Sequence, residues 1–202
     1  MGVHSRAMRA RLIAVLLFLC AAALAQAQTK KPNPRPHPDD GAVTAGVYRN
    51  NYFGFEYKLP AGFEDRTAAM PKTGAGISYV LLYASEPKQN TRVASSITLF
   101  ADDAGHWKSK NGAEYLDKVG AQMAKQADLV GKLTSLDIGG HQFFRQDFQP
   151  HASFPVRQTI VATVMKGYVL SAVLTAGNAA GIETLLAGWR AAKFTPTSKP
   201  RH

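Results

Sequence analysis

Cysteine is almost absent from this chain of 202 residues, in which Cys20 is the only one. A single cysteine excludes a disulfide framework, because such frameworks need pairs. Cys20 lies inside an apolar run near the N-terminus and follows Leu19, where a lipoprotein signal needs a small residue. We expect Cys20 to be removed with this run, which also excludes thiol catalysis; its lipidation is the alternative.

Motifs of catalysis and nucleotide binding are also missing. No G-x-S-x-G segment occurs, so the nucleophile elbow of α/β-hydrolases is excluded. Gly74-Ala75-Gly76 lacks the third glycine of a dinucleotide-binding turn, and no P-loop lysine motif occurs. No histidine stands in an H-x-H, H-x-x-x-H or H-E-x-x-H spacing. The sequence therefore predicts no cofactor and favours a protein that is not an enzyme.

The N-terminal segment combines positive charge with the apolar run. Arg6, Arg9 and Arg11 precede residues 12–24, a stretch of about the length of a secretory signal core and too short for a comfortable membrane span. Small-x-small sites follow, which end at Ala25 and Ala27. We predict a signal peptide over residues 1–27, cleaved after Ala25 or Ala27, and a periplasmic or secreted protein. An uncleaved anchor is the alternative.

Two segments that flank the domain have the composition of unstructured chain. Proline at every second position from 32 to 38 forbids helix and favours an extended spacer. We therefore predict a disordered linker over residues 28–46, one ordered domain over 47–194 and a disordered basic tail over 195–202.

The charge of the chain is concentrated at its ends. The formal net charge is +10, yet residues 41–189 hold fourteen basic and twelve acidic side chains. The excess of positive charge at the C-terminus suits weak peripheral contact with a membrane through residues 193–202. Without interleaved aromatic residues, it does not indicate a nucleic-acid partner. We expect an unknown protein or small ligand of the envelope as the partner.

Hydrophobic periodicity predicts the elements of the domain. Strands are expected at 47–50, 53–59, 77–85, 93–101, 133–138, 142–148, 157–165 and 168–175, with a polar connection over 102–110. Gly139-Gly140 and Lys166-Gly167 indicate hairpin turns. A helix is expected after Asn111, with an apolar stripe from Leu116 to Val130 and an end at Gly131. A second helix is expected over 179–193.

The strands at 157–165 and 168–175 carry apolar side chains on both faces. Strands of this kind occur in sheets that are covered on both sides. Two hairpins and two helices in this order predict an α+β fold, in which a mostly antiparallel β-sheet is sandwiched between helices.

The stretch from Tyr48 to Phe63 reads Y-x-N-x-x-F-G-F-x-Y-x-L-P-x-G-F. It resembles the N-terminal signature of the PsbP/Mog1-like family, where an N-x-x-x-G-F element leads to a strand that ends in P-x-G-W; here Phe63 takes the place of the tryptophan. The resemblance spans residues 47–194 and implies an α-β-α sandwich. Its members include a photosystem II subunit, a binder of a nuclear transport GTPase and exported bacterial proteins. It implies an exported, non-enzymatic interaction or ligand-binding module.

Aromatic and cationic residues near the second hairpin are the candidate partner surface. Phe143, Arg145, Phe154 and Arg157 can form a mixed apolar and cationic patch of the kind that binds proteins. The alternative is that the phenylalanines are buried under helices. For the aromatic residues between Tyr48 and Tyr57, packing under the last helix is favoured over a groove.

A metal-dependent or serine hydrolase of the envelope is the alternative function. Asp102, Asp103 and His106 lie on one predicted loop, and carboxylates beside an imidazole suit a divalent cation. A triad would need Ser95 or Ser96 to meet His141 and an aspartate in space. An ordinary solvated turn is the simpler interpretation of the acidic loop.

Overall fold

A computed structural model describes residues 37–71, 77–87 and 93–195. The predicted signal peptide with Cys20, Ala25 and Ala27, the first part of the linker and nearly all of the tail lie outside these residues. The strands are β1 (Gly41–Thr44), β2 (Val47–Asn50), β3 (Phe55–Lys58), β4 (Glu64–Asp65), β5 (Ser78–Ser85), β6 (Ser96–Asp103), β7 (Ala127–Ile138), β8 (His141–Pro150), β9 (Arg157–Met165), β10 (Tyr168–Ala176) and β11 (Lys193–Phe194). The helices are a 3-10 turn over Thr67–Ala69, α2 (Gly112–Met123) and α3 (Ala179–Arg190).

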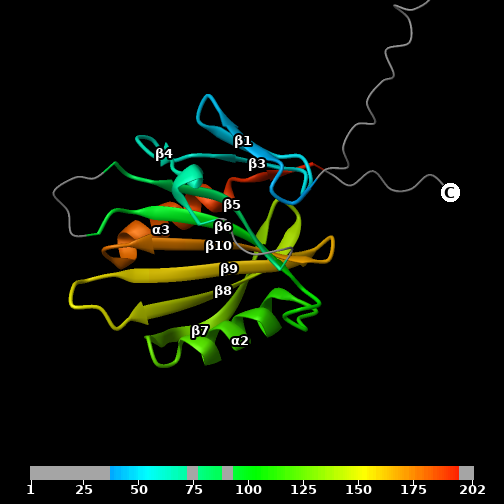
Figure 1. The fold of residues 1–202 in the computed structure, drawn as a ribbon. Helices are drawn as coiled ribbons and strands as arrows, with labels where there is room; N and C mark the ends of the chain where they lie inside the picture. The colour runs from blue at the N-terminus through cyan, green and yellow to red at the C-terminus, as the bar shows by residue number, and fades with distance from the viewer. Residues whose placement is uncertain (1–36, 72–76, 88–92, 196–202) are drawn as a thin grey trace, which may run out of the picture. The chain divides into compact units, whose positions relative to one another are not determined.

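Seven strands form the larger sheet, in the order β4-β5-β6-β10-β9-β8-β7. All of its neighbouring strands run antiparallel, and Figure 1 shows the sheet from β5 to β7. The hairpin turns at Gly139-Gly140 and Lys166-Gly167 place both of their residues at positive φ, as two-residue hairpins need. The predicted antiparallel pairing of this half of the chain is confirmed.

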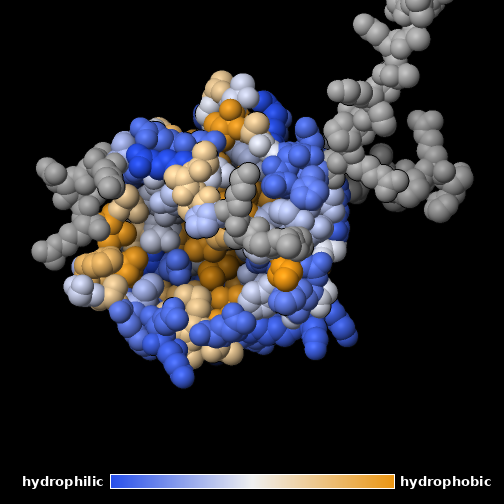
Figure 2. Space-filling model, in the orientation of Figure 1, coloured by the Kyte–Doolittle hydropathy of each residue, from blue (hydrophilic) through white to orange (hydrophobic). Residues whose placement is uncertain are grey.

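Alternating residues of the central strands belong to two separate hydrophobic clusters. Val161 and Leu170 are buried with the apolar face of α3, whereas Ala162 and Val169 are buried with that of α2. Helix α2 lies mainly against β7, β8 and β9. Figure 2 shows apolar side chains in a hollow over the middle strands of the larger sheet. The mostly antiparallel α+β fold is confirmed.

A second sheet of four strands, in the order β1-β2-β3-β11, shares the larger cluster with α3. Helices are therefore not the sole cover of the larger sheet. Strand β1 lies inside the predicted linker, so the boundary of the domain at residue 47 is wrong. Ala45 and Gly46, both at positive φ, turn the chain back, and β1 pairs with β2 over Thr44↔Val47. This local hairpin gives residues 41–44 the partner that the composition alone did not predict.

The helix α2 ends at Met123, well before the predicted end at Gly131. Asn111 caps its start by accepting a hydrogen bond from the backbone nitrogen of Glu114 at 2.9 Å. Residues 127–130 belong to β7 instead, where Leu129 lies opposite Phe148. Apolar residues at these positions fit the period of a helix as well as that of a strand. Their pairing with β8 places them in a strand. Gly131, at φ 69°, lies where the β7–β8 register shifts.

Strand β3 and helix α3 meet in the aromatic part of the larger cluster. Trp189 is fully buried, with its ring centroid 5.7 Å from Phe55 and 5.5 Å from Tyr57. Asn178 caps α3 by accepting a hydrogen bond from the backbone nitrogen of Gly181 at 2.9 Å. Phe55 and Tyr57 therefore pack under the last helix, as the favoured interpretation expects, whereas Tyr52 and Phe53 pack against Tyr168 of β10.

Within the part of the chain that the structure describes, no helix is long and apolar enough to cross a membrane.

Candidate functional site

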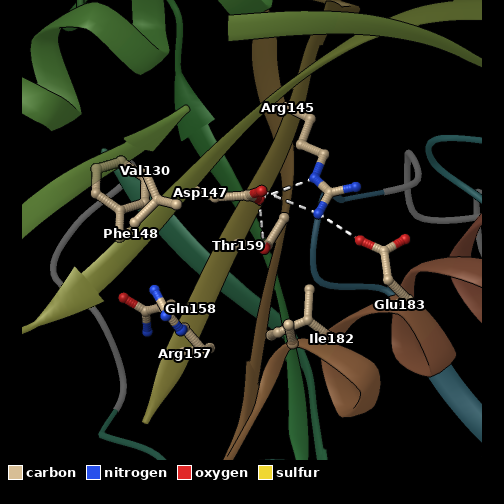
Figure 3. A pocket seen from close by; sticks show the side chains of 10 residues that line it. Val130, Arg145, Asp147, Phe148, Arg157, Gln158, Thr159, Ile182 and Glu183 are labelled. Carbon is tan, nitrogen blue, oxygen red and sulfur yellow. Dashed lines mark hydrogen bonds and ion pairs between the residues drawn. The ribbon is translucent and has the colours of Figure 1, made fainter. Parts of the chain in front are cut away.

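A pocket of about 160 Å³ opens between the end of the larger sheet and the first turns of α3. Strands β7, β8 and β9 form its floor, and α3 forms one wall. Figure 3 shows Asp147 and Thr159 in the middle, Arg157 on one side and Arg145 with Glu183 on the other. Its lining residues are Val130, Arg145, Asp147, Phe148, Arg157, Gln158, Thr159, Ala179, Ile182 and Glu183.

Strand register places these polar side chains on one face. Asp147 lies opposite Val130 on β7 and opposite Thr159 on β9, so the three form a row across the sheet. Directly opposite residues share a face, and so do residues two apart on one strand. Arg145 on β8 and Arg157 on β9 each precede a member of this row by two residues. All therefore face α3.

Arg145 is the centre of the charged network. Its Nε donates to Oδ1 of Asp147 at 2.8 Å, and its Nη2 donates to Oδ2 of the same carboxylate at 3.0 Å. Nη2 also donates to Glu183 Oε1 at 2.6 Å, which ties β8 to α3. The Thr159 hydroxyl donates to Asp147 Oδ1 at 2.7 Å. The network holds Asp147 in one orientation, because three of its hydrogen bonds come from two strands.

Arg145 keeps its charge although its side chain is mostly buried. Its side chain is 17% exposed, whereas that of Glu183 is 57% exposed. Burial by itself lowers the pKa of Arg145, but the hydrogen bonds and charges of Asp147 and Glu183 outweigh this effect and raise the pKa. The guanidinium is therefore permanently charged, and the network is a fixed pattern of charge.

The structure separates the residues of the predicted partner surface. Arg145 and Arg157 line the pocket together. Phe143 is fully buried and contacts Trp189 and Phe194, so its assignment to the surface is wrong. It shares a face with Arg145, but α3 covers that part of the face. Phe154 is 39% exposed on the β8–β9 connection and is not among the residues that line the pocket.

The acidic loop has structural partners. Asp102 is the buried penultimate residue of β6, and its Oδ2 accepts a hydrogen bond from the Tyr115 hydroxyl at 2.7 Å. Asp103 Oδ1 accepts one from the backbone nitrogen of His106 at 2.6 Å. Across residues 37–71, 77–87 and 93–195, no group of three or more His, Cys, Asp or Glu side chains is placed to hold a metal ion.

The side chains considered for a triad have other surroundings. The ring of His141 packs against Phe194, with centroids 4.8 Å apart. Ser96 pairs with Ser85 and Thr175 in the interior of the sheet, and the Ser95 backbone nitrogen donates to Glu86. In the described ranges, the imidazoles that pair with a carboxylate are His37 with Asp39 and His151 with Asp128. None of these residues lines the pocket.

Sequence reasoning missed Asp147, Thr159 and Glu183 as members of the site. The spacing Arg145-Gln146-Asp147 carries a usable signal, because residues two apart on a strand lie side by side. Glu183 lies 38 positions from Arg145 and on a helix, so only the tertiary structure brings it to the pocket.

No protein-family model matches the sequence, and no curated protein matches it. Among solved structures, the chain is similar to cyanobacterial PsbP (CyanoP) from Synechocystis sp. PCC 6803, with 12% identity and a TM-score of 0.48 over 76% of this chain and 95% of that chain. It is also similar to PA94 from Pseudomonas aeruginosa, a protein of unknown function and putative regulator. That match has 16% identity and a TM-score of 0.42 over 71% of this chain and 90% of the other. Likenesses at this level do not establish a shared function.

Proposed function

We propose that this chain is a non-enzymatic binding module of the bacterial envelope and that the pocket between β7, β8, β9 and α3 is its binding site. The observation that carries the proposal is the fixed network of Arg145, Asp147 and Thr159 beside an apolar wall. Pockets that combine a few oriented polar groups with apolar lining are typical ligand sites.

The rest of the sequence prediction belongs to the same proposal. A signal peptide over residues 1–27 would deliver the domain to the periplasm or the medium. The larger sheet of the domain would form the middle layer between helices. The basic residues of 193–202 would add weak contact with anionic headgroups. N-terminal sequencing of the protein purified from its native envelope tests the cleavage after Ala25 or Ala27.

A fragment screen followed by ¹H–¹⁵N NMR tests the binding site. We expect fragments that bind to shift the amide signals of Val130, Gln158 and Ile182, because these residues line the pocket. A filling variant, Ala179→Phe, should abolish these shifts. Ala180→Phe is the matched control, since Ala180 is also exposed, is the next residue of α3 and does not line the pocket.

Two results would contradict the proposal. One is a screen in which every fragment leaves these amides unmoved in the folded protein. The other is turnover of a hydrolase substrate that disappears when His106 or His141 is replaced, which would favour the metal-dependent or serine hydrolase instead.

A further inference from the structure

The two cations of the pocket differ in how their charge is balanced. Arg145 is paired with both carboxylates, Asp147 and Glu183. No carboxylate of the described residues lies within ion-pairing distance of Arg157, although Arg157 is partly buried. The four side chains together carry no net charge, but Arg145 makes the hydrogen bonds to both carboxylates, so among the described residues the Arg157 guanidinium has no ion-pair partner.

The surroundings of Arg157 favour an anion. Glu183 lies on the opposite side of the pocket, with Thr159 between them (Figure 3). Ala179, the first residue of α3, lines the pocket, and the first turn of α3 holds no acidic residue. The positive end of the helix dipole therefore lies in the same wall, capped by the neutral side chain of Asn178 and not offset by an acidic residue of the first turn. A guanidinium offers parallel N–H donors that match a planar carboxylate.

The remaining lining limits what the anion can carry. Val130 and Ile182 are aliphatic, and the exposed part of the pocket surface is mainly carbon. Its volume of 160 Å³ is similar to that of an apolar cavity of about 150 Å³ that takes up benzene. A short branched aliphatic chain fits such a space.

We infer that the pocket binds a short aliphatic carboxylate, with the carboxylate on Arg157 and the alkyl group against Val130 and Ile182. This inference rests on the proposed function, since it names the ligand class of the same site. A free small acid and the C-terminus of a peptide that ends in valine share this chemistry. Nothing is consumed or transferred, so binding is reversible.

Titrations at pH 7, followed by the amide signals of the pocket, test this inference in the full domain. The probes are 3-methylbutanoate and its neutral isostere 3-methylbutanamide, together with N-acetyl-Gly-Gly-Val with a free and with an amidated C-terminus. We expect each carboxylate to bind at least tenfold more tightly than its amide. The stronger of the two acids identifies the source of the ligand.

Arg157→Gln should remove this preference for the acid, and Arg157→Lys should keep part of it, because charge survives without the paired donors. Arg49→Gln is the control, since Arg49 lies on β2, pairs with Glu56 and is not among the residues that line the pocket. Equal affinity for acid and amide would overturn the inference while supporting the proposed binding site. An Arg157→Gln variant that binds the acid as tightly as the wild type would likewise overturn the inference and support the binding site. Absence of binding by all four probes would also overturn it, and the fragment screen then decides separately whether the pocket binds at all.

Discussion

Arg145 and Asp147, two residues apart on β8, form a bidentate ion pair with distances of 2.8 and 3.0 Å on the face of the sheet that α3 covers. Thr159 of β9 completes the pair by donating to the same carboxylate. A charged pair at this position is tolerated because its donors and acceptors are matched within the sheet.

Replacing Asp147 by asparagine should therefore lower the stability of the domain. The change leaves a mostly buried guanidinium with Glu183 as its single carboxylate, and we expect a loss of about 1–2 kcal/mol in the free energy of unfolding. Urea unfolding measures this. Glu183→Gln is the control and should cost less than about 1 kcal/mol, because Glu183 is 57% exposed. Equal losses for both variants would contradict the central role of Asp147.

Removal of the hydroxyl group should affect the stability of the domain differently at two buried tyrosines. The Tyr57 hydroxyl is buried and has no hydrogen-bond partner among the described residues, so Tyr57→Phe should be neutral or stabilise by up to about 1 kcal/mol. The Tyr48 hydroxyl accepts a hydrogen bond from Asn50 Nδ2 at 3.1 Å, so Tyr48→Phe should cost about 1 kcal/mol. Thermal and urea unfolding of both variants compares them. A larger loss for Tyr57→Phe would show that its hydroxyl has a partner.

Tyr48 should also make stability depend on pH in the alkaline range. Burial raises the pKa of Tyr48 to about 12, and the hydrogen bond from Asn50 opposes this only in part. The folded protein thus holds the phenolic proton more tightly than the unfolded chain, whose tyrosine pKa is about 10. This contribution is complete below pH 10 and is lost as the pH rises to 12, with a slope of about 1.4 kcal/mol per pH unit. Urea unfolding from pH 9 to 12 should show a shallower decline for Tyr48→Phe, and an unchanged slope would contradict the assignment.

Replacing either of two glycines of α2 by alanine should change the stability of the domain in opposite directions. A Cβ at Gly112 would lie 2.1 Å from the Ala162 carbonyl oxygen of β9, so Gly112→Ala should destabilise by about 3 kcal/mol. A Cβ at Gly120 would lie 3.5 Å from Leu129, an ordinary contact. Gly120→Ala should stabilise by about 0.5–1 kcal/mol, because alanine loses less backbone entropy in a helix. Unfolding midpoints of the two variants measure the difference, and a tolerated Gly112→Ala would show that α2 can shift away from β9.

Much of the fold follows from local patterns in the sequence. The turns at Gly139-Gly140 and Lys166-Gly167 need positive φ at consecutive residues, which few residue pairs adopt easily, so they mark both hairpins. Two-sided apolar strands likewise indicate a covered sheet. The caps Asn111 and Asn178 begin the helices because an asparagine side chain satisfies a free backbone N–H of the first turn.

Other features depended on partners that are distant in the sequence. Ala127 and Val130 continue the apolar stripe of α2, yet they form β7, because β8 offers a full ladder of hydrogen bonds to that segment. Phe143 and Arg145 share one face of β8, and only the position of α3 buries the first and pairs the second with Glu183.

By itself, the sequence determined where the two long hairpins, their turns and the helix starts lie, because backbone conformation and hydrophobic period are set by near neighbours. The tertiary structure alone decided where α2 stops, which aromatic side chains are buried and which charges meet. It brings Arg145, Asp147, Thr159 and Glu183 together from two strands and a helix, and among the residues that the structure describes it leaves Arg157 without a carboxylate within ion-pairing distance. Such a charge pattern depends on distances across the fold, which no local spacing specifies.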